Sequence, residues 1–320
     1  VVIDLGTGAH TPADSQVVEL TYSGVPRPPS GFGGVTFERH PAAVMYTIGA
    51  SLHDVPHSVG RMWFPCRDTF TDKARFSYRI RTVAPYKAVC GGEFRAARPL
   101  GPDTTEWVYE LIHTPKGRAA HAYPAFNRLN QVFNHFVGWF GPYRWPKVGY
   151  VGVPFYAGAM EHALNIAYPS RFIDSTRYDE RLWAHELAHA WFGNLVTCSH
   201  PQDMWLNEGF ARWAEALYLE AVGGPAHYHD YIRKLHLGVA GAPERPAGGK
   251  LILAAMPQSH TYSKTTYDKG GLAAHALRSA LGDGLLRQVL QTWFRNHAFG
   301  NASTDDFEAL IRALPPSEER

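Results

Sequence analysis

The sequence predicts an α+β protein, with a β-rich N-terminal domain over residues 1–118 and a mostly helical domain over residues 119–320. Apolar and polar residues alternate over 74–82, which predicts a half-buried strand. Over 126–137 the apolar residues recur at helical spacing instead. Between these two patterns, the Gly- and Pro-containing stretch 115–120 predicts the domain boundary.

Further elements are expected in the second domain. An apolar run at 147–155 predicts a short strand. The helix that contains residue 181 is expected to run to about Val196, and Asp203 is a candidate N-cap for the helix after it. Ser303 and Asp306 have the spacing of a capping box at the start of the last helix.

Composition excludes several classes of function. The chain has 320 residues, 45% of them hydrophobic, and a formal net charge of +2, which is typical of a soluble globular protein. Without clustered Lys and Arg, neither a nucleic-acid nor a membrane-binding surface is expected. No apolar run approaches the roughly 18 residues that span a bilayer. Cys66, Cys90 and Cys198 form no CxxC pair and are expected to be buried thiols.

The stretch "RLWAHELAHAWFGNL" carries the main chemical signal. His185 and His189 are four residues apart, so on a helix both rings point to one side, with Glu186 beside them. Eighteen residues separate His189 from Glu208, which lies early in the next predicted helix. An antiparallel helical hairpin would bring Glu208 to the two histidines and complete a zinc site. The alternative is a helix whose histidines are satisfied by hydrogen bonds alone.

Four motifs in order resemble one family. "HELAHAWFGNLVT" followed by "WLNEGFARWAEALYLE" looks like the gluzincin zinc aminopeptidases of the aminopeptidase N type. "WFPCRD" at 63–68, "GAMEH" at 158–162 and "YDKGG" at 267–271 are similar to that family's other segments. The resemblance implies a shortened β domain followed by a thermolysin-like catalytic domain, with a small mixed sheet and then a mostly helical part.

The resemblance also implies a mechanism of peptide hydrolysis. One zinc ion per chain would be held by His185, His189 and Glu208, and Glu186 would be the general base on the zinc-bound water. The Tyr267 hydroxyl would stabilise the oxyanion.

Substrate recognition is implied for the GAMEH segment. Its backbone would pair with an extended peptide, and Glu161 would hold the free α-ammonium group. The candidate substrate-binding residues in this segment are Gly158, Ala159, Met160, Glu161 and His162. Glu215 lies two turns after Glu208 and would either orient a zinc-binding histidine or remain a solvated charge.

The chain departs from the family pattern in three ways. His162 stands where the family motif ends in Asn. Asp54 is the only acid in the region where the family has a second residue that binds the substrate amine, so either Asp54 takes this substrate-binding role with a shorter reach or the second anchor is missing. After "YDKGG" there is room for one more helical set but not for the family's large C-terminal helical domain. The predicted function is therefore a zinc aminopeptidase acting on peptides. The alternatives are a zinc endopeptidase or dedicated peptide hydrolase, and an inactive peptide-binding module.

Overall fold

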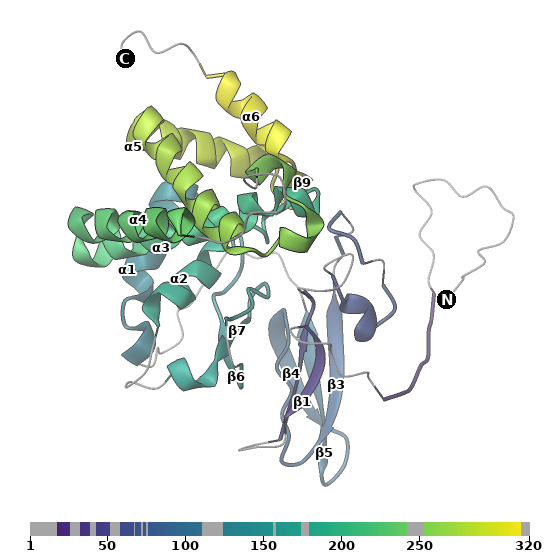
Figure 1. Cartoon of the computed structure of the whole chain (residues 1–320). Helices are drawn as coiled ribbons and strands as arrows, with labels where there is room; N and C mark the ends of the chain where they lie inside the picture. Colours follow the sequence, from purple (N-terminus) through teal and green to yellow (C-terminus); the bar gives the residue numbers. More distant parts are fainter. Residues whose placement is uncertain are drawn as a thin grey trace, which may run out of the picture.

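The computed structural model describes residues 18–25, 33–38, 43–51, 58–110, 124–241 and 252–314, except positions 67, 72, 75, 156, 157 and 174–178. Five strands form the N-terminal region of this described chain, and a mostly helical region follows (Figure 1). This arrangement confirms the predicted α+β class. The predicted boundary between residues 118 and 119 lies within 111–123, outside the described residues, and stays a prediction.

The N-terminal strands form two antiparallel sheets. One pairs β1 (Gly34–Glu38) with β2 (Val44–Ile48), and the other has the order β3-β5-β4. The strands of the second sheet are β3 (Ser77–Val83), β4 (Glu93–Pro99) and β5 (Thr104–Glu110). β3 alternates half-buried and exposed side chains, as the period of two over 74–82 predicted.

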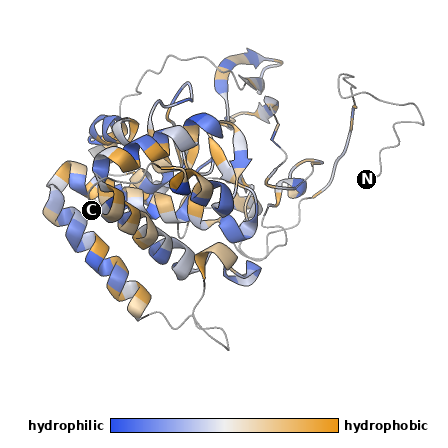
Figure 2. Cartoon of the chain, turned by 90° about the horizontal axis from the view of Figure 1, so that it is seen from above, coloured by the Kyte–Doolittle hydropathy of each residue, from blue (hydrophilic) through white to orange (hydrophobic). Residues whose placement is uncertain are grey.

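The helical region is built around the helix Trp205–Gly223, which is α3. The elements of this region are α1 (Leu129–Phe140), β6 (Tyr150–Val153), β7 (Ile166–Pro169), α2 (Glu180–Ala188), β8 (Val196–Cys198), α3 (Trp205–Gly223), α4 (Pro225–Ala240), α5 (Gly270–Asn296), β9 (Gly300–Ala302) and α6 (Thr304–Arg312). α3 packs against α1, α2, α4 and α5. Its side chains Phe210 and Trp213 are almost fully buried, together with Trp139 of α1 and Trp183 of α2. In Figure 2 blue residues mark the outer faces of the helices.

A small mixed sheet lies beside this core. β6 and β7 pair in parallel, and Met160 forms an antiparallel bridge to Ala167 of β7. The bridge has hydrogen bonds of 2.9 Å and 2.8 Å in the two directions. The segment that resembles the substrate-binding motif therefore occupies the edge of this sheet, next to β7.

Two local predictions around the hairpin are wrong. α2 ends at Ala188 and does not reach Val196, because the chain turns at Gly193 with φ of 112° and then enters β8, which pairs with the distant β9. Asp203 does not cap α3. It lies in a 3-10 turn, and its Oδ1 accepts hydrogen bonds from the backbone and hydroxyl of Thr304 instead.

The remaining local predictions have mixed outcomes. The capping box of Ser303 and Asp306 is present at the start of α6. All three cysteines are free thiols, but Cys198 alone is buried, Cys90 is partly buried and Cys66 is exposed, so the expectation of three buried thiols is wrong. None of the described helices is both long and apolar enough to cross a bilayer.

Candidate active site

α2 and α3 bring three potential metal ligands to one point. Asp179 caps α2 by accepting hydrogen bonds from the Arg181 and Leu182 backbone amides. His185 lies in the last turn of α2 and His189 is its C-cap, so both rings face α3. One carboxylate oxygen of Glu208, in the first turn of α3, lies 3.3 Å from His185 Nε2 and 3.4 Å from His189 Nε2.

The second nitrogen of each imidazole is already engaged. His185 Nδ1 lies 3.0 Å from Glu215 Oε1, and His189 Nδ1 lies 2.9 Å from the carbonyl oxygen of Phe192. These contacts leave both Nε2 atoms directed at Glu208. The three ligand atoms lie within 4.8 Å of one another, and all three residues are buried. Two imidazole nitrogens and one carboxylate oxygen are the donor set of a catalytic zinc site, so these residues fit the metal.

The electrostatics of the cluster favour a cation. Burial lowers the pKa of His185, but hydrogen bonds to Glu208 and Glu215 outweigh burial and raise this pKa to about 9. Burial likewise lowers the pKa of His189, while Glu161 and Glu208 raise it to about 10. The carboxylates therefore create a negative field at the two rings, which is the field that binds a divalent cation.

Glu186 lies beside the three potential ligands and forms a second cluster with His189 and Glu161. One of its carboxylate oxygens lies within 4.8 Å of a ligand atom of His189 and an oxygen of Glu161. Burial raises the pKa of Glu186 to about 8, despite the opposing effect of the two histidines. A carboxyl group with this pKa can accept and return a proton near neutral pH.

The GAMEH segment places Glu161 next to Glu186. Asn194 Nδ2 donates a 2.8 Å hydrogen bond to the Glu161 backbone carbonyl, which ties the segment to the turn after α2. Met160 is held by its bridge to β7, and Ala159 packs against the main core. Gly158 is exposed and has φ of +67°, a conformation that favours glycine.

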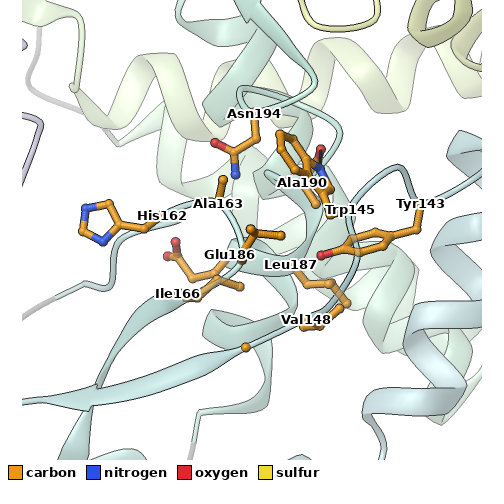
Figure 3. A pocket seen from close by; sticks show the side chains of 12 residues that line it. Tyr143, Trp145, Val148, His162, Ala163, Ile166, Glu186, Leu187, Ala190 and Asn194 are labelled. Atoms are coloured by element: carbon orange, nitrogen blue, oxygen red, sulfur yellow. Dashed lines mark hydrogen bonds between the residues drawn. The ribbon is translucent and has the colours of Figure 1, made fainter. Parts of the chain in front are cut away.

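His162 follows Glu161 and lines a small pocket. Tyr143, Trp145, Glu186 and Asn194 also line it, and in Figure 3 Glu186 lies between His162 and the two aromatic side chains. Burial lowers the pKa of His162 to about 4, so the imidazole is neutral at physiological pH. A neutral imidazole offers one donor and one acceptor at this position.

Tyr267 approaches the site from a third element. It lies in a π-helical turn over Thr265–Lys269, directly before α5. Its ring stacks on the His185 ring with a centroid distance of 6.1 Å and an interplanar angle of 17°. Burial, and then the charges of nearby Glu208 and Glu161, raise the pKa of Tyr267 well above its ordinary value, so the phenol stays protonated and able to donate.

The structure brings Glu186, Glu161, Glu215 and Tyr267 to the three potential ligands, and His162 lines a pocket with Glu186. Gly158, Ala159 and Met160 precede Glu161 in the same segment. Asp54 lies outside the described residues. Tyr262 was not predicted from the sequence. Burial raises the pKa of its phenol well above the ordinary value, and the charges of nearby Glu208 and Glu161 raise it further. Asn194, Arg212 and Asp268 were not predicted either. The signal for Arg212 was its helical spacing from Glu208 and Glu215, four and three residues away on one face.

Comparison with known proteins finds aminopeptidases among the sequence relatives of this chain. Aminopeptidase M1-B of Oryza sativa subsp. japonica is 30% identical over 236 residues, which cover 65% of this chain and 25% of that protein. Aminopeptidase N of Oryctolagus cuniculus is 32% identical over 307 residues, which cover 79% of this chain and 32% of that protein. The chain thus spans about a quarter to a third of the length of these curated relatives.

Solved structures share the fold. A mutant M1 zinc metallopeptidase from Deinococcus radiodurans, bound to a Tyr-Ser-Ala substrate, superposes with a TM-score of 0.69 at 24% identity, covering 82% of this chain and 65% of that one. Leukotriene A4 hydrolase from Saccharomyces cerevisiae gives 0.69 at 19% identity, covering 88% and 48%. The model of the peptidase family M1 domain matches residues 124–315, which is more than half of the chain. The chain therefore belongs to peptidase family M1, as its resemblance to the gluzincin aminopeptidases predicted.

Proposed function

We propose that this chain is a zinc-dependent aminopeptidase that removes N-terminal residues from peptides. The observation that carries the proposal is the convergence of His185, His189 and Glu208 at one buried point, with Glu186 and Glu161 beside it. The relatives named as aminopeptidases support it. Further support comes from structural neighbours, one bound to a Tyr-Ser-Ala substrate and another to L-tryptophan.

The residues divide the chemistry of peptide hydrolysis among them. A zinc ion held by His185, His189 and Glu208 would supply Lewis acidity, polarising the scissile carbonyl and lowering the pKa of water. Glu186 accepts a proton from the attacking water and returns it to the leaving amine, a shuttle that suits its raised pKa. The Tyr267 hydroxyl donates a hydrogen bond to the oxygen on which negative charge develops.

Glu161 supplies the preference for a free N-terminus. Its carboxylate lies near Glu186, so a substrate ammonium paired with Glu161 would place the first peptide bond beside the base. The backbone of the Met160 segment lies at the edge of the β6–β7 sheet, where an extended peptide can add as a strand. Together these contacts restrict cleavage to the first residue.

The test follows one ten-residue peptide by mass spectrometry, once with a free and once with an acetylated N-terminus. We expect stepwise loss of single residues from the free peptide only, abolished by a chelator and by Glu186→Gln. Glu161→Gln should raise KM more than it lowers kcat, because it removes the charge that binds the amine. Internal cleavage of both peptides would show an endopeptidase instead, and no cleavage of either would contradict the proposal.

A further inference from the structure

The segment that carries Tyr267 is joined to the metal site by an ion-pair chain on α3. Arg212 Nε donates to Asp268 Oδ1 at 2.9 Å, and Arg212 Nη1 donates to Glu215 Oε1 at 2.8 Å. The same Glu215 oxygen accepts from His185 Nδ1 at 3.0 Å. The Arg212 guanidinium therefore links Asp268, the residue after Tyr267, to Glu215. Glu215 in turn contacts His185, one of the proposed zinc ligands.

Together with the Tyr267–His185 stacking, these ion pairs form a closed ring of contacts. The Tyr267 ring stacks on His185, and Asp268 follows Tyr267 directly in the π-helical turn. Asp268 and Glu215 are both buried, with 3% and 4% of their surfaces exposed, and Arg212 is the one cation that pairs with both of them among the described residues. Lys264 lies farther from Asp268, at 3.9 Å, and Tyr231 also donates a hydrogen bond to Glu215. A π-helical turn is one residue wider than an α-helical one and is held by its surroundings more than by intrinsic preference.

Close backbone packing fixes the distance between α3 and the start of α5, which the ion pairs of Arg212 span. A Cβ on Gly209 would lie 2.6 Å from the Gly270 Cα, and a Cβ on Gly270 would lie 2.7 Å from the Gly209 Cα. α3 and the start of α5 thus touch backbone to backbone, one residue after Glu208 and three residues after Tyr267. The glycine contact sets the distance between the two elements, and the ion pairs of Arg212 oppose sliding and rotation at that distance.

We propose that Arg212 is a positioning residue, which fixes the Tyr267 turn relative to the zinc ligands through its ion pairs with Asp268 and Glu215. It is not a member of either group of candidate metal ligands among the described residues. Its effect on rate rests on the proposed peptidase function, whereas its effect on the order of the 265–269 turn does not. Arg suits this position because its fork reaches two acceptors at once, which a lysine ammonium on a flexible stem does not reproduce.

The kinetic test is a double-mutant cycle between Arg212→Gln and Tyr267→Phe on the zinc-loaded chain. Arg212→Gln should lower kcat by about 10- to 100-fold, the order expected for a misplacement near 1 Å, with KM changed by less than about twofold. In the Tyr267→Phe background the same change should have almost no further effect on kcat, because the hydroxyl that it positions is gone. If the two effects multiply independently, Arg212 does not act through Tyr267 and the proposal is wrong.

The second readout needs no activity. Hydrogen exchange followed by mass spectrometry on the full zinc-loaded chain should show faster exchange in a fragment covering 262–271 of the Arg212→Gln variant. Arg278→Gln is the matched control, since Arg278 also pairs with two carboxylates, those of Glu220 and Asp283, but at the far end of α3. It should leave this fragment unchanged. Unchanged exchange in Arg212→Gln would overturn the proposal.

One further measurement and one replacement variant keep the outcomes distinct. Zinc content by elemental analysis shows whether a slower variant has merely lost metal, and a loss of kcat that matches a loss of zinc would count against a role through Tyr267. If Arg212→Gln does not fold, Asp268→Asn replaces it, because it keeps the side-chain size and removes the charge that Arg212 pairs with. An inactive wild-type chain whose 262–271 fragment still responds would contradict the proposed function and support the role of Arg212.

Discussion

Gly209→Ala tests how tightly the site depends on the contact between α3 and α5. The new Cβ would lie 2.6 Å from the Cα and 2.8 Å from the carbonyl carbon of Gly270. Ordinary contacts begin near 3.4 Å, so the two backbones must separate by about 0.8 Å. Both neighbours are backbone atoms and cannot rotate away, so we expect overpacking to cost about 1–3 kcal/mol of unfolding free energy.

The same displacement should slow catalysis. Gly209 follows Glu208, and Gly270 lies three residues after Tyr267, so the separation moves the carboxylate and the phenol apart. We expect kcat to fall by about 10- to 100-fold. Denaturant unfolding and steady-state kinetics on a free N-terminal peptide measure the two effects.

A control for Gly209→Ala exists in α1. A Cβ on Gly138 has no neighbour within 4 Å, so Gly138→Ala should stabilise the chain by up to about 1 kcal/mol through helix propensity and leave kcat unchanged. A Gly209→Ala variant as stable and active as wild type would refute the inference that backbone contact sets the geometry of the site.

Three further predictions concern single side chains. Glu215→Gln removes the negative charge that holds His185 and should weaken zinc affinity by about 10- to 100-fold, measured by competition with a chromogenic chelator. His162→Asn should change the relative kcat/KM among peptides that differ in the first residue but leave zinc affinity unchanged, and equal ratios would show that position 162 does not contact the substrate. Burial lowers the pKa of His135 below 6.5, so the folded state disfavours its protonation, and the unfolding free energy should fall as pH drops below about 6.5. His135→Gln should reduce this pH dependence, and an unchanged profile would assign it to other groups.

The sequence predicted the convergence of the three potential metal ligands better than it predicted their surroundings. His185, His189 and Glu208 were identifiable because helical geometry fixes the spacing of the first two, and a short hairpin supplies the third. The end of α2 was predicted too late because it depends on β8, whose partner β9 is about a hundred residues away in sequence. Asp203 was assigned to the nearest helix, whereas the structure pairs it with α6. Local patterns do not contain such long-range pairings.

The π-helical turn at Thr265–Lys269 shows the same limit at the site itself. No periodicity in "TTYDK" distinguishes a π-helical turn from an α-helical one. The sequence alone would suggest that Asp268 is a solvated charge, whereas in the structure it pairs with Arg212. Arg212 in turn reads as a surface residue on an amphipathic helix. Their pairing depends on the crossing of α3 and α5, which the Gly209–Gly270 contact permits.

One face of α3 therefore carries three side chains on which the geometry of the site depends. Glu208 offers a metal ligand, Arg212 pairs with the tyrosine turn, and Glu215 holds the His185 ring, at the i, i+4 and i+7 spacing of a single helical stripe. The opposite side of the helix is packed into the core through Trp213 and neighbouring apolar residues. Because the helix is rigid over these two turns, a rotation of α3 would displace all three groups together. Core substitutions around Trp213 should thus affect zinc affinity and kcat jointly, whereas Arg212→Gln should affect kcat far more than zinc affinity.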